Sequence, residues 1–139
     1  MKIKITKSHG TKNSFIIIYN NKNHSLIKNK ITQICKKFET DGLLLISDYE
    51  GYDYKMDYFN NDGSWETMCA NGARCAALYM FKKNKCNQKI KFLTGDGSHS
   101  IKINNSNSIE LSMKTPIFRT HEITPCGYEG RFIDSGAKH

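Results

Sequence analysis

The sequence is poor in several residue types that mark particular classes of protein. It has only two prolines and one tryptophan among 139 residues, and only three of its 21 basic residues are arginine. No segment approaches the roughly 18 consecutive apolar residues that a membrane-spanning helix needs. The segment Met1–Thr6 alternates lysine with isoleucine, where a signal peptide would have a long apolar run. These absences predict a cytoplasmic protein that has no membrane partner.

The cysteines also lack the spacing of a metal site or a disulfide framework. Their number is odd, and they form no C-x-x-C pair and lie near no histidine pair. We therefore expect no metal ion, and we expect most of the thiols to be small buried hydrophobic groups. The five cysteines are Cys35, Cys69, Cys75, Cys86 and Cys126.

The basic residues are numerous but are not clustered. The formal net charge is +8 and the pI is near 9.3, which by themselves suggest a nucleic-acid partner. However, the lysines are spread along the chain among many asparagines and isoleucines. We therefore predict a solvated basic surface, with attraction of small anionic substrates as the less favoured alternative, and no nucleic-acid partner.

The apolar pattern predicts a single α+β domain over residues 1–139, in which antiparallel strands wrap around one central apolar helix. The expected helices are an amphipathic one over Ile31–Phe38 and a second, apolar on all sides, over Cys69–Lys83. The expected strands are a pair formed by Ile3–Ile5 and Phe15–Tyr19, then Leu43–Ile46 and Tyr54–Phe59, and a β-meander over Ile90–Phe92, Ser100–Ile103 and Ile109–Met113.

Cys69 stands at the start of the predicted buried helix. The first N–H groups of a helix have no partner within the helix and carry a partial positive charge, so a thiolate there is stabilised. The N–H groups of Asn71 and Gly72 would also receive a carboxylate, which brings the α-carbon of an amino acid close to the Cys69 sulfur. The residues alone leave two alternatives open. Cys69 is either an acid/base that exchanges an α-proton or a buried thiol without function.

Two further cysteines are expected to be structural. Cys75 lies about 9 Å along the helix axis from Cys69, too far for a disulfide or a shared proton relay. We predict that Cys75 fills the core, and that Cys126 is a structural cysteine in a loop.

Several segments together resemble the diaminopimelate epimerase family. Phe59–Ser64 and Met68–Cys75 are similar to the family pattern F-N-x-D-G-S, a short spacer, and C-G-N-G-x-R. Gly10–Phe15 resembles the early G-x-G-N-D-F, and Thr40–Leu43 resembles an A-D-G-hydrophobic segment. Ser135–His139 resembles the G-N-P-H segment that opens the second half of the family. The chain therefore resembles the N-terminal half only, with residues 133–139 as the start of the crossover to a missing C-terminal half.

The resemblance implies a cofactor-independent enzyme built from two similar halves, each an antiparallel or mixed β-barrel-like sheet around a central helix. Such an enzyme inverts the α-carbon of LL-diaminopimelate to the meso form in lysine biosynthesis, with one acid/base cysteine from each half. Cys69 corresponds to one of the two. The resemblance further implies a complementary C-terminal half, as a separate chain or a missing segment, and permits a homodimer. The implied substrate-binding residues are Asn13, Asn60, Asn71, Gly72 and His139.

The sequence departs from the family pattern at several positions. The second catalytic cysteine has no counterpart, because Cys126 lies in a different context. Lys12 replaces a glycine, Ser14 an acidic residue, Ala70 a glycine and Ala137 an asparagine. Loss of that asparagine concerns the distal part of the substrate more than the chemistry at the α-carbon.

Two alternatives to a diaminopimelate epimerase remain open. Lys12 and Ala137 favour a racemase for another amino acid, such as histidine, on the same scaffold. The second alternative is a non-catalytic subunit that binds an amino acid or a protein partner, because the resemblance implies that the sequence ends where one wall of the active site would begin.

Overall fold

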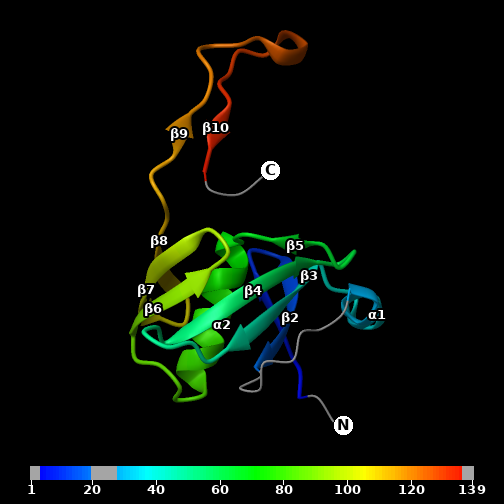
Figure 1. Ribbon diagram of the computed structural model, residues 1–139, viewed down its shortest axis with the longest axis vertical. Helices are drawn as coiled ribbons and strands as arrows, with labels where there is room; N and C mark the ends of the chain where they lie inside the picture. Colours follow the sequence, from blue (N-terminus) through cyan, green and yellow to red (C-terminus); the bar gives the residue numbers. More distant parts are fainter. Residues whose placement is uncertain (1–3, 20–27, 136–139) are drawn as a thin grey trace.

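The computed structural model describes residues 4–19 and 28–135 of the chain (Figure 1). The body of the fold is a curved sheet with two helices, and the last part of the described chain extends away from it (Figure 1). In chain order the elements are β1 (Thr6–Gly10), β2 (Asn13–Tyr19), α1 (Lys28–Phe38), β3 (Gly42–Ser47), β4 (Tyr54–Asn60), β5 (Trp65–Glu66), α2 (Ala70–Lys82), β6 (Lys89–Thr94), β7 (Gly97–Asn105), β8 (Ser108–Ser112), β9 (Ile117–Phe118), the short 3₁₀ helix η1 (Pro125–Gly127) and β10 (Ile133–Asp134).

The large sheet is mixed. Its strand order is β1-β2-β3-β4-β6-β7-β8, with β5 paired to β4 at one end. Two neighbouring pairs, β2 with β3 and β4 with β6, are parallel, and the other pairs are antiparallel. Parallel neighbours need a crossover connection, which α1 supplies for the first pair and α2 for the second. The prediction of an α+β sheet wrapped around a central helix is confirmed.

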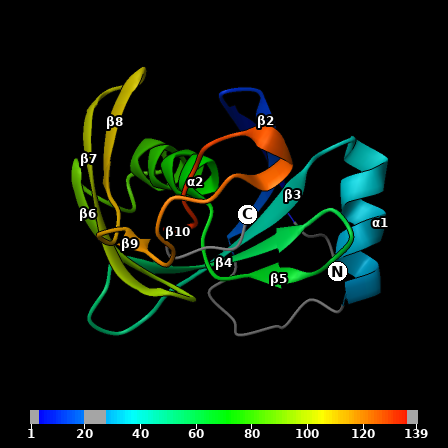
Figure 2. The same cartoon turned by 90° about the horizontal axis from the view of Figure 1, so that it is seen from above.

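The two helices lie on opposite faces of the sheet (Figure 2). Helix α2 occupies the concave side, where no residue from Ala70 to Phe81 is exposed, as its apolar sequence predicts. Helix α1 is amphipathic and covers the outer side of β2 and β3. Alternate residues along β2 and β3 therefore enter different apolar clusters. The α2 cluster includes Phe15, Ile17, Leu44 and Ile46, and the α1 cluster includes Ile16, Ile18, Ile31, Cys35 and Leu43.

The first strand is not where the sequence pattern places it. The strand that pairs with β2 is the polar segment Thr6–Gly10, not the predicted Ile3–Ile5, and Ile3 lies outside the described residues. The register pairs Gly10 with Asn13, so only Thr11 and Lys12 form the turn, with φ values of 52° and 67°. Positive φ at both positions gives a turn whose twist matches the hairpin. The turn thus fixes the register and sets Asn13 as the first residue of β2.

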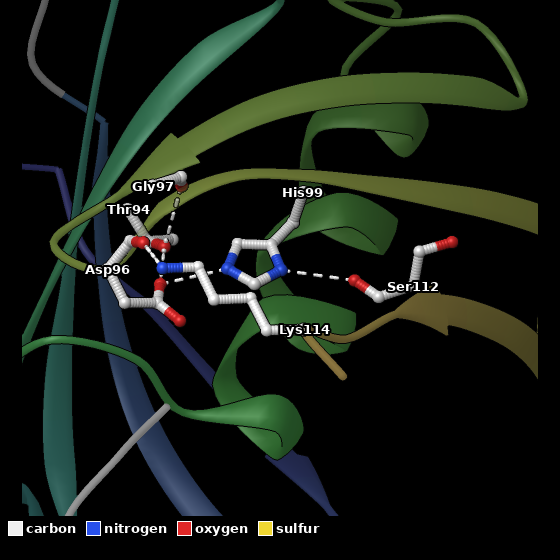
Figure 3. Close-up of polar contacts among 6 residues, drawn as sticks. All are labelled: Thr94, Asp96, Gly97, His99, Ser112 and Lys114. Carbon is white, nitrogen blue, oxygen red and sulfur yellow. Dashed lines mark hydrogen bonds and ion pairs between the residues drawn. The ribbon is translucent and has the colours of Figure 1, made fainter. Parts of the chain in front are cut away.

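A buried polar network fastens the turn between β6 and β7 to the end of β8 (Figure 3). His99 is 4% exposed, and its ring nitrogens lie 2.8 Å from Asp96 Oδ1 and 3.0 Å from the carbonyl oxygen of Ser112. The Thr94 hydroxyl also donates to Asp96 Oδ1, at 2.6 Å, and Lys114 donates to the Asp96 carbonyl. The network therefore holds the point at which the chain leaves the sheet.

The same turn supports the segment that precedes α2. Gly95 lies directly against Trp65 and Thr67, since a Cβ at Gly95 would be 2.4 Å from Trp65 Cζ2 and 2.9 Å from Thr67 Cα. Only a residue without a side chain fits in this space. The β6–β7 turn is thereby packed against the approach to Cys69.

Beyond Lys114 the chain is mostly exposed and extends away from the sheet (Figure 1). Strands β9 and β10 pair antiparallel, and Cys126 lies exposed in η1 between them, consistent with a cysteine in a loop. Of the predicted crossover segment 133–139, only 133–135 lie within the described residues. Within the described part of the chain, no helix has the length and apolar character to cross a membrane, and no cluster of His, Cys, Asp and Glu side chains could hold a metal ion.

Candidate active site

Cys69 is the N-cap residue of α2. Its backbone is extended, with φ −140° and ψ 113°, and its sulfur accepts a hydrogen bond from the backbone N–H of Gly72 at 3.3 Å. The side chain is neither fully buried nor exposed. Cys75, six residues further along, is only 6% exposed and belongs to the α2 cluster, so its predicted place in the core is confirmed.

The environment of Cys69 favours the thiol over the thiolate. Burial raises the pKa of Cys69 above the ordinary thiol value, while the N–H groups of Gly72 and Asn71 and the Arg74 guanidinium act in the opposite direction. The lowered pKa predicted from the helix start is therefore wrong for this chain, because loss of solvent around the sulfur outweighs the positive helix pole. Cys69 rests protonated and can donate its proton.

This raised pKa predicts how Cys69 reacts with alkylating reagents. We expect iodoacetamide to modify Cys69 slowly near neutral pH and faster as the pH rises, with a midpoint above about 8.5, because only the thiolate is nucleophilic. Peptide mass spectrometry across a pH series measures the rate at Cys69, and exposed Cys126 in the same sample shows that the reagent is active. A midpoint for Cys69 below about 8.5 would contradict the protonated resting state.

Asn13 and Asn71 lie beside Cys69. The Asn13 side-chain oxygen is 3.9 Å from the Cys69 sulfur, which donates to it, and 3.4 Å from the Asn71 side-chain nitrogen. Close packing of Gly10 brings these groups together, since a Cβ there would lie 3.2 Å from the Asn71 carbonyl oxygen. The structure thus joins the N-terminus of α2 to the β1–β2 hairpin.

The residues that hold both side chains in place are ones whose role cannot be predicted from the sequence. Asn71 Oδ1 accepts from the Thr11 hydroxyl at 3.0 Å and from Arg74 at 2.5 Å. Asn13 Nδ2 donates to Asp41 Oδ2 at 3.2 Å. Asp41 and Arg74 both lie inside motifs that resemble the family, so the motifs mark them, but nothing in the sequence shows what they touch.

Asp41 connects three parts of the site. Its Oδ2 accepts from the backbone N–H and hydroxyl of Ser14 at 2.7 Å and 2.8 Å, and these bonds lower the pKa of the Asp41 carboxyl. Its carbonyl oxygen accepts from the N–H of Asn61 at 3.0 Å. The charged Asp41 side chain thereby orients Asn13, while its backbone holds the turn that follows Asn60.

Asn60 lies at the end of β4, opposite Gly42 in the register. Its Oδ1 accepts from the Tyr58 hydroxyl at 2.6 Å, and its Nδ2 donates to the Ser64 hydroxyl at 3.1 Å. No hydrogen bond among the described residues joins Asn60 directly to Cys69. The connection runs through the Asp41 backbone.

Gly72 and His139 complete the predicted set. Gly72 is buried, and a Cβ there would lie 2.8 Å from Leu44 Cδ2 and 3.5 Å from the Cys69 sulfur. Its N–H points at that sulfur, so in this structure it is not free for a carboxylate. His139 lies outside the described residues.

The sequence also matches a known protein family. The family model for diaminopimelate epimerase matches residues 5–118. The chain belongs to the diaminopimelate epimerase family. A diaminopimelate epimerase from Flavobacterium psychrophilum is 36% identical over 117 residues, which cover 81% of this chain and 46% of that protein. One from Helicobacter pylori is 30% identical over 134 residues, covering 94% of this chain and 48% of the relative.

The chain spans about half the length of the curated relatives in the diaminopimelate epimerase family that it matches. Solved structures show the same fold. A phenazine biosynthesis protein of the PhzF family from Bacillus anthracis superposes with a TM-score of 0.67 at 20% identity, covering 86% of this chain and 43% of that one. A methylitaconate-delta-isomerase superposes with a TM-score of 0.56 at 10% identity, over 94% of this chain and 40% of the other.

Proposed function

We propose that this chain forms one half of a cofactor-independent diaminopimelate epimerase and supplies Cys69 as one of its two acid/base groups. The observation that carries the proposal is Cys69 at the start of α2, with Asn13 and Asn71 beside it, in a chain whose relatives are named diaminopimelate epimerase. The substrate is LL-diaminopimelate and the product is the meso form, in lysine biosynthesis.

The proposed reaction exchanges one proton for another at the α-carbon. A base in the complementary half, the second cysteine, breaks the α-C–H bond on one face and takes the proton, leaving the electron pair on the α-carbon and the carboxylate. The Cys69 thiol then donates its proton to the opposite face, which forms the new C–H bond and leaves a thiolate. The raised pKa of Cys69 suits this first role as donor. The reverse reaction uses the same groups with their protons exchanged.

The substrate is held by groups around the sulfur. We assign the α-carboxylate to the N-terminus of α2, at the N–H groups of Asn71 and Gly72, where the positive helix pole favours an anion. The Gly72 N–H then moves its hydrogen bond from the sulfur to the carboxylate. Asn13, Asn60 and His139 contact the rest of the substrate.

The exposed tail, residues 115–135, supports the proposal that a complementary half binds this chain. Its aromatic side chains are more than half exposed: Phe118 at 59%, Tyr128 at 78% and Phe132 at 58%. Large apolar side chains that are this exposed favour a segment that another protein surface covers. We propose that the C-terminal half, as a separate chain or a segment outside this sequence, covers the tail and closes the site.

The experiment mixes this chain with the C-terminal half of the Flavobacterium psychrophilum relative in D₂O and follows the α-proton of the substrate by ¹H NMR. We expect the α-proton signal of LL-diaminopimelate to disappear in the mixture and to persist with either half alone. Histidine and the other common amino acids, tested in parallel, identify a racemase with another substrate. Calorimetric binding of an amino acid without exchange of any substrate would instead identify a non-catalytic binding subunit and overturn the proposal.

A further inference from the structure

Four side chains at the end of β4 and in the turn that follows it form a continuous chain of hydrogen bonds. The Tyr58 hydroxyl is 2.6 Å from Asn60 Oδ1, Asn60 Nδ2 is 3.1 Å from Ser64 Oγ, and Ser64 Oγ is 2.6 Å from Asp62 Oδ1. All four lie within seven residues, but only Asn60 has a role in the proposed function. The other three side chains, those of Tyr58, Asp62 and Ser64, have no role in that proposal.

The charge of Asp62, at one end of this chain of hydrogen bonds, determines which group donates and which accepts in each bond. The pKa of the Asp62 carboxyl is lowered by hydrogen bonds from Ser64, so Asp62 is charged and can only accept. The Ser64 hydroxyl must then donate to Asp62 and accept from Asn60. Because the Asn60 amide nitrogen faces Ser64, its oxygen faces Tyr58, and the Tyr58 hydroxyl donates.

The position of the Tyr58 hydroxyl is set by packing of its ring. The ring meets Phe15 edge to face, with centroids 6.0 Å apart, and closes over Gly42, where a Cβ would lie 2.7 Å from Tyr58 Cε2. Burial raises the pKa of Tyr58 to about 12, and the charge of Cys69 acts in the same direction. Tyr58 therefore keeps its proton at neutral pH and remains a hydrogen-bond donor.

We propose that Tyr58 is a positioning residue that, together with Ser64 and Asp62, locks the Asn60 amide in one orientation. In this orientation Oδ1 is engaged by Tyr58, and the second Nδ2 proton has no partner in the part of the chain that the structure describes. Asn60 accordingly presents an N–H donor, so that the site favours a ligand with an acceptor oxygen at this place. This role for a ligand rests on the proposed function, whereas the orientation of the amide does not.

The test compares two tyrosine-to-phenylalanine variants, each of which removes only a hydroxyl group. Tyr58→Phe keeps the ring and removes the donor to Asn60. Tyr54→Phe is the matched control, because Tyr54 is fully buried and its hydroxyl has no hydrogen-bond partner among the described residues. In the 139-residue chain, ¹H–¹⁵N NMR of the Asn60 side-chain amide, assigned with Asn60→Asp, reports the orientation directly.

We expect Tyr58→Phe to shift the Asn60 side-chain signals and to speed their exchange with water severalfold, while Tyr54→Phe leaves both unchanged. In the mixture of the two halves, Tyr58→Phe should raise KM for diaminopimelate about 3- to 10-fold with kcat within about twofold, the size of one neutral hydrogen bond. A merely structural role would lower the amount of active enzyme and leave KM unchanged.

A second variant, Ser64→Ala, tests the same proposal if Tyr58→Phe fails to fold. Ser64→Ala breaks the same chain on the other side of Asn60 and should also move the Asn60 amide signals. Unchanged Asn60 signals in a folded Tyr58→Phe or Ser64→Ala variant overturn the proposal. Signals that move in a mixture with no α-proton exchange support the positioning role and contradict the proposed function alone.

Discussion

Replacing Cys69 with serine should reduce α-proton exchange in the mixture of the two halves by at least about 10³-fold. A serine hydroxyl is nearly the size of the thiol but holds its proton far more tightly, so it neither donates to nor accepts from the α-carbon at a useful rate. General acid–base groups contribute about 10²- to 10⁴-fold, and Cys69 is required in both directions of the proposed reaction. The rate at which the ¹H α-proton signal disappears in D₂O measures the exchange, and calorimetry follows substrate binding separately.

Two other cysteines give the controls for this prediction. Cys126→Ser changes an exposed thiol in η1 and should leave exchange unaltered, while Cys75→Ala removes the buried thiol on the same helix. Cys75→Ala should lower stability and spare the rate per folded molecule. If Cys69→Ser keeps a tenth or more of the exchange rate, the assignment of Cys69 as an acid/base is wrong.

The sequence predicts α2 well because the information is local. A stretch from Ala70 to Phe81 without an exposed residue needs an apolar sequence on all sides, and that sequence is visible without any tertiary contact. The position of Cys69 at the helix start follows for the same reason. The direction of its pKa shift does not, since it depends on burial by residues distant in the chain.

Strand β1 shows how a tertiary contact overrides local propensity. Thr6–Gly10 is too polar to predict as a strand, whereas the isoleucines before it suggest one. Its pairing is decided by the turn at Thr11 and Lys12, both with positive φ. The family resemblance places a glycine where Lys12 stands, and the backbone there explains the preference for glycine.

In the candidate site, too, some residues can be predicted from the sequence and others depend on tertiary contacts. The family resemblance implies Asn13, Asn60 and Asn71 as site residues, and the structure brings Asn13 and Asn71 to Cys69. The side chains that hold these residues in place cannot be predicted from the spacing of motifs. Asp41 reaches Asn13 across 28 positions of the chain, a contact that only the sheet register creates.

Gly63, in the turn that follows Asn60, should be very sensitive to substitution. It has φ +80°, and a Cβ there would lie 2.7 Å from the carbonyl oxygen of Lys28, the first residue of α1. We expect Gly63→Ala to lower the free energy of unfolding by about 3–5 kcal/mol, from the left-handed backbone and from overpacking against a backbone atom that cannot rotate away. Chemical denaturation of the 139-residue chain, monitored by circular dichroism, measures the change.

Gly51→Ala is the matched control, since Gly51 has φ +81° but nothing within 4 Å of a Cβ. It carries the backbone cost alone, so we expect a loss of about 1–2 kcal/mol. Equal losses at the two positions would show that the contact with Lys28 contributes nothing. A larger loss at Gly63 means that the turn carrying Asn60 is fixed by its fit against α1, because the N–H of Gly63 also donates to the Asn60 carbonyl at 2.9 Å. The outer helix would then set the position of a residue in the proposed substrate site.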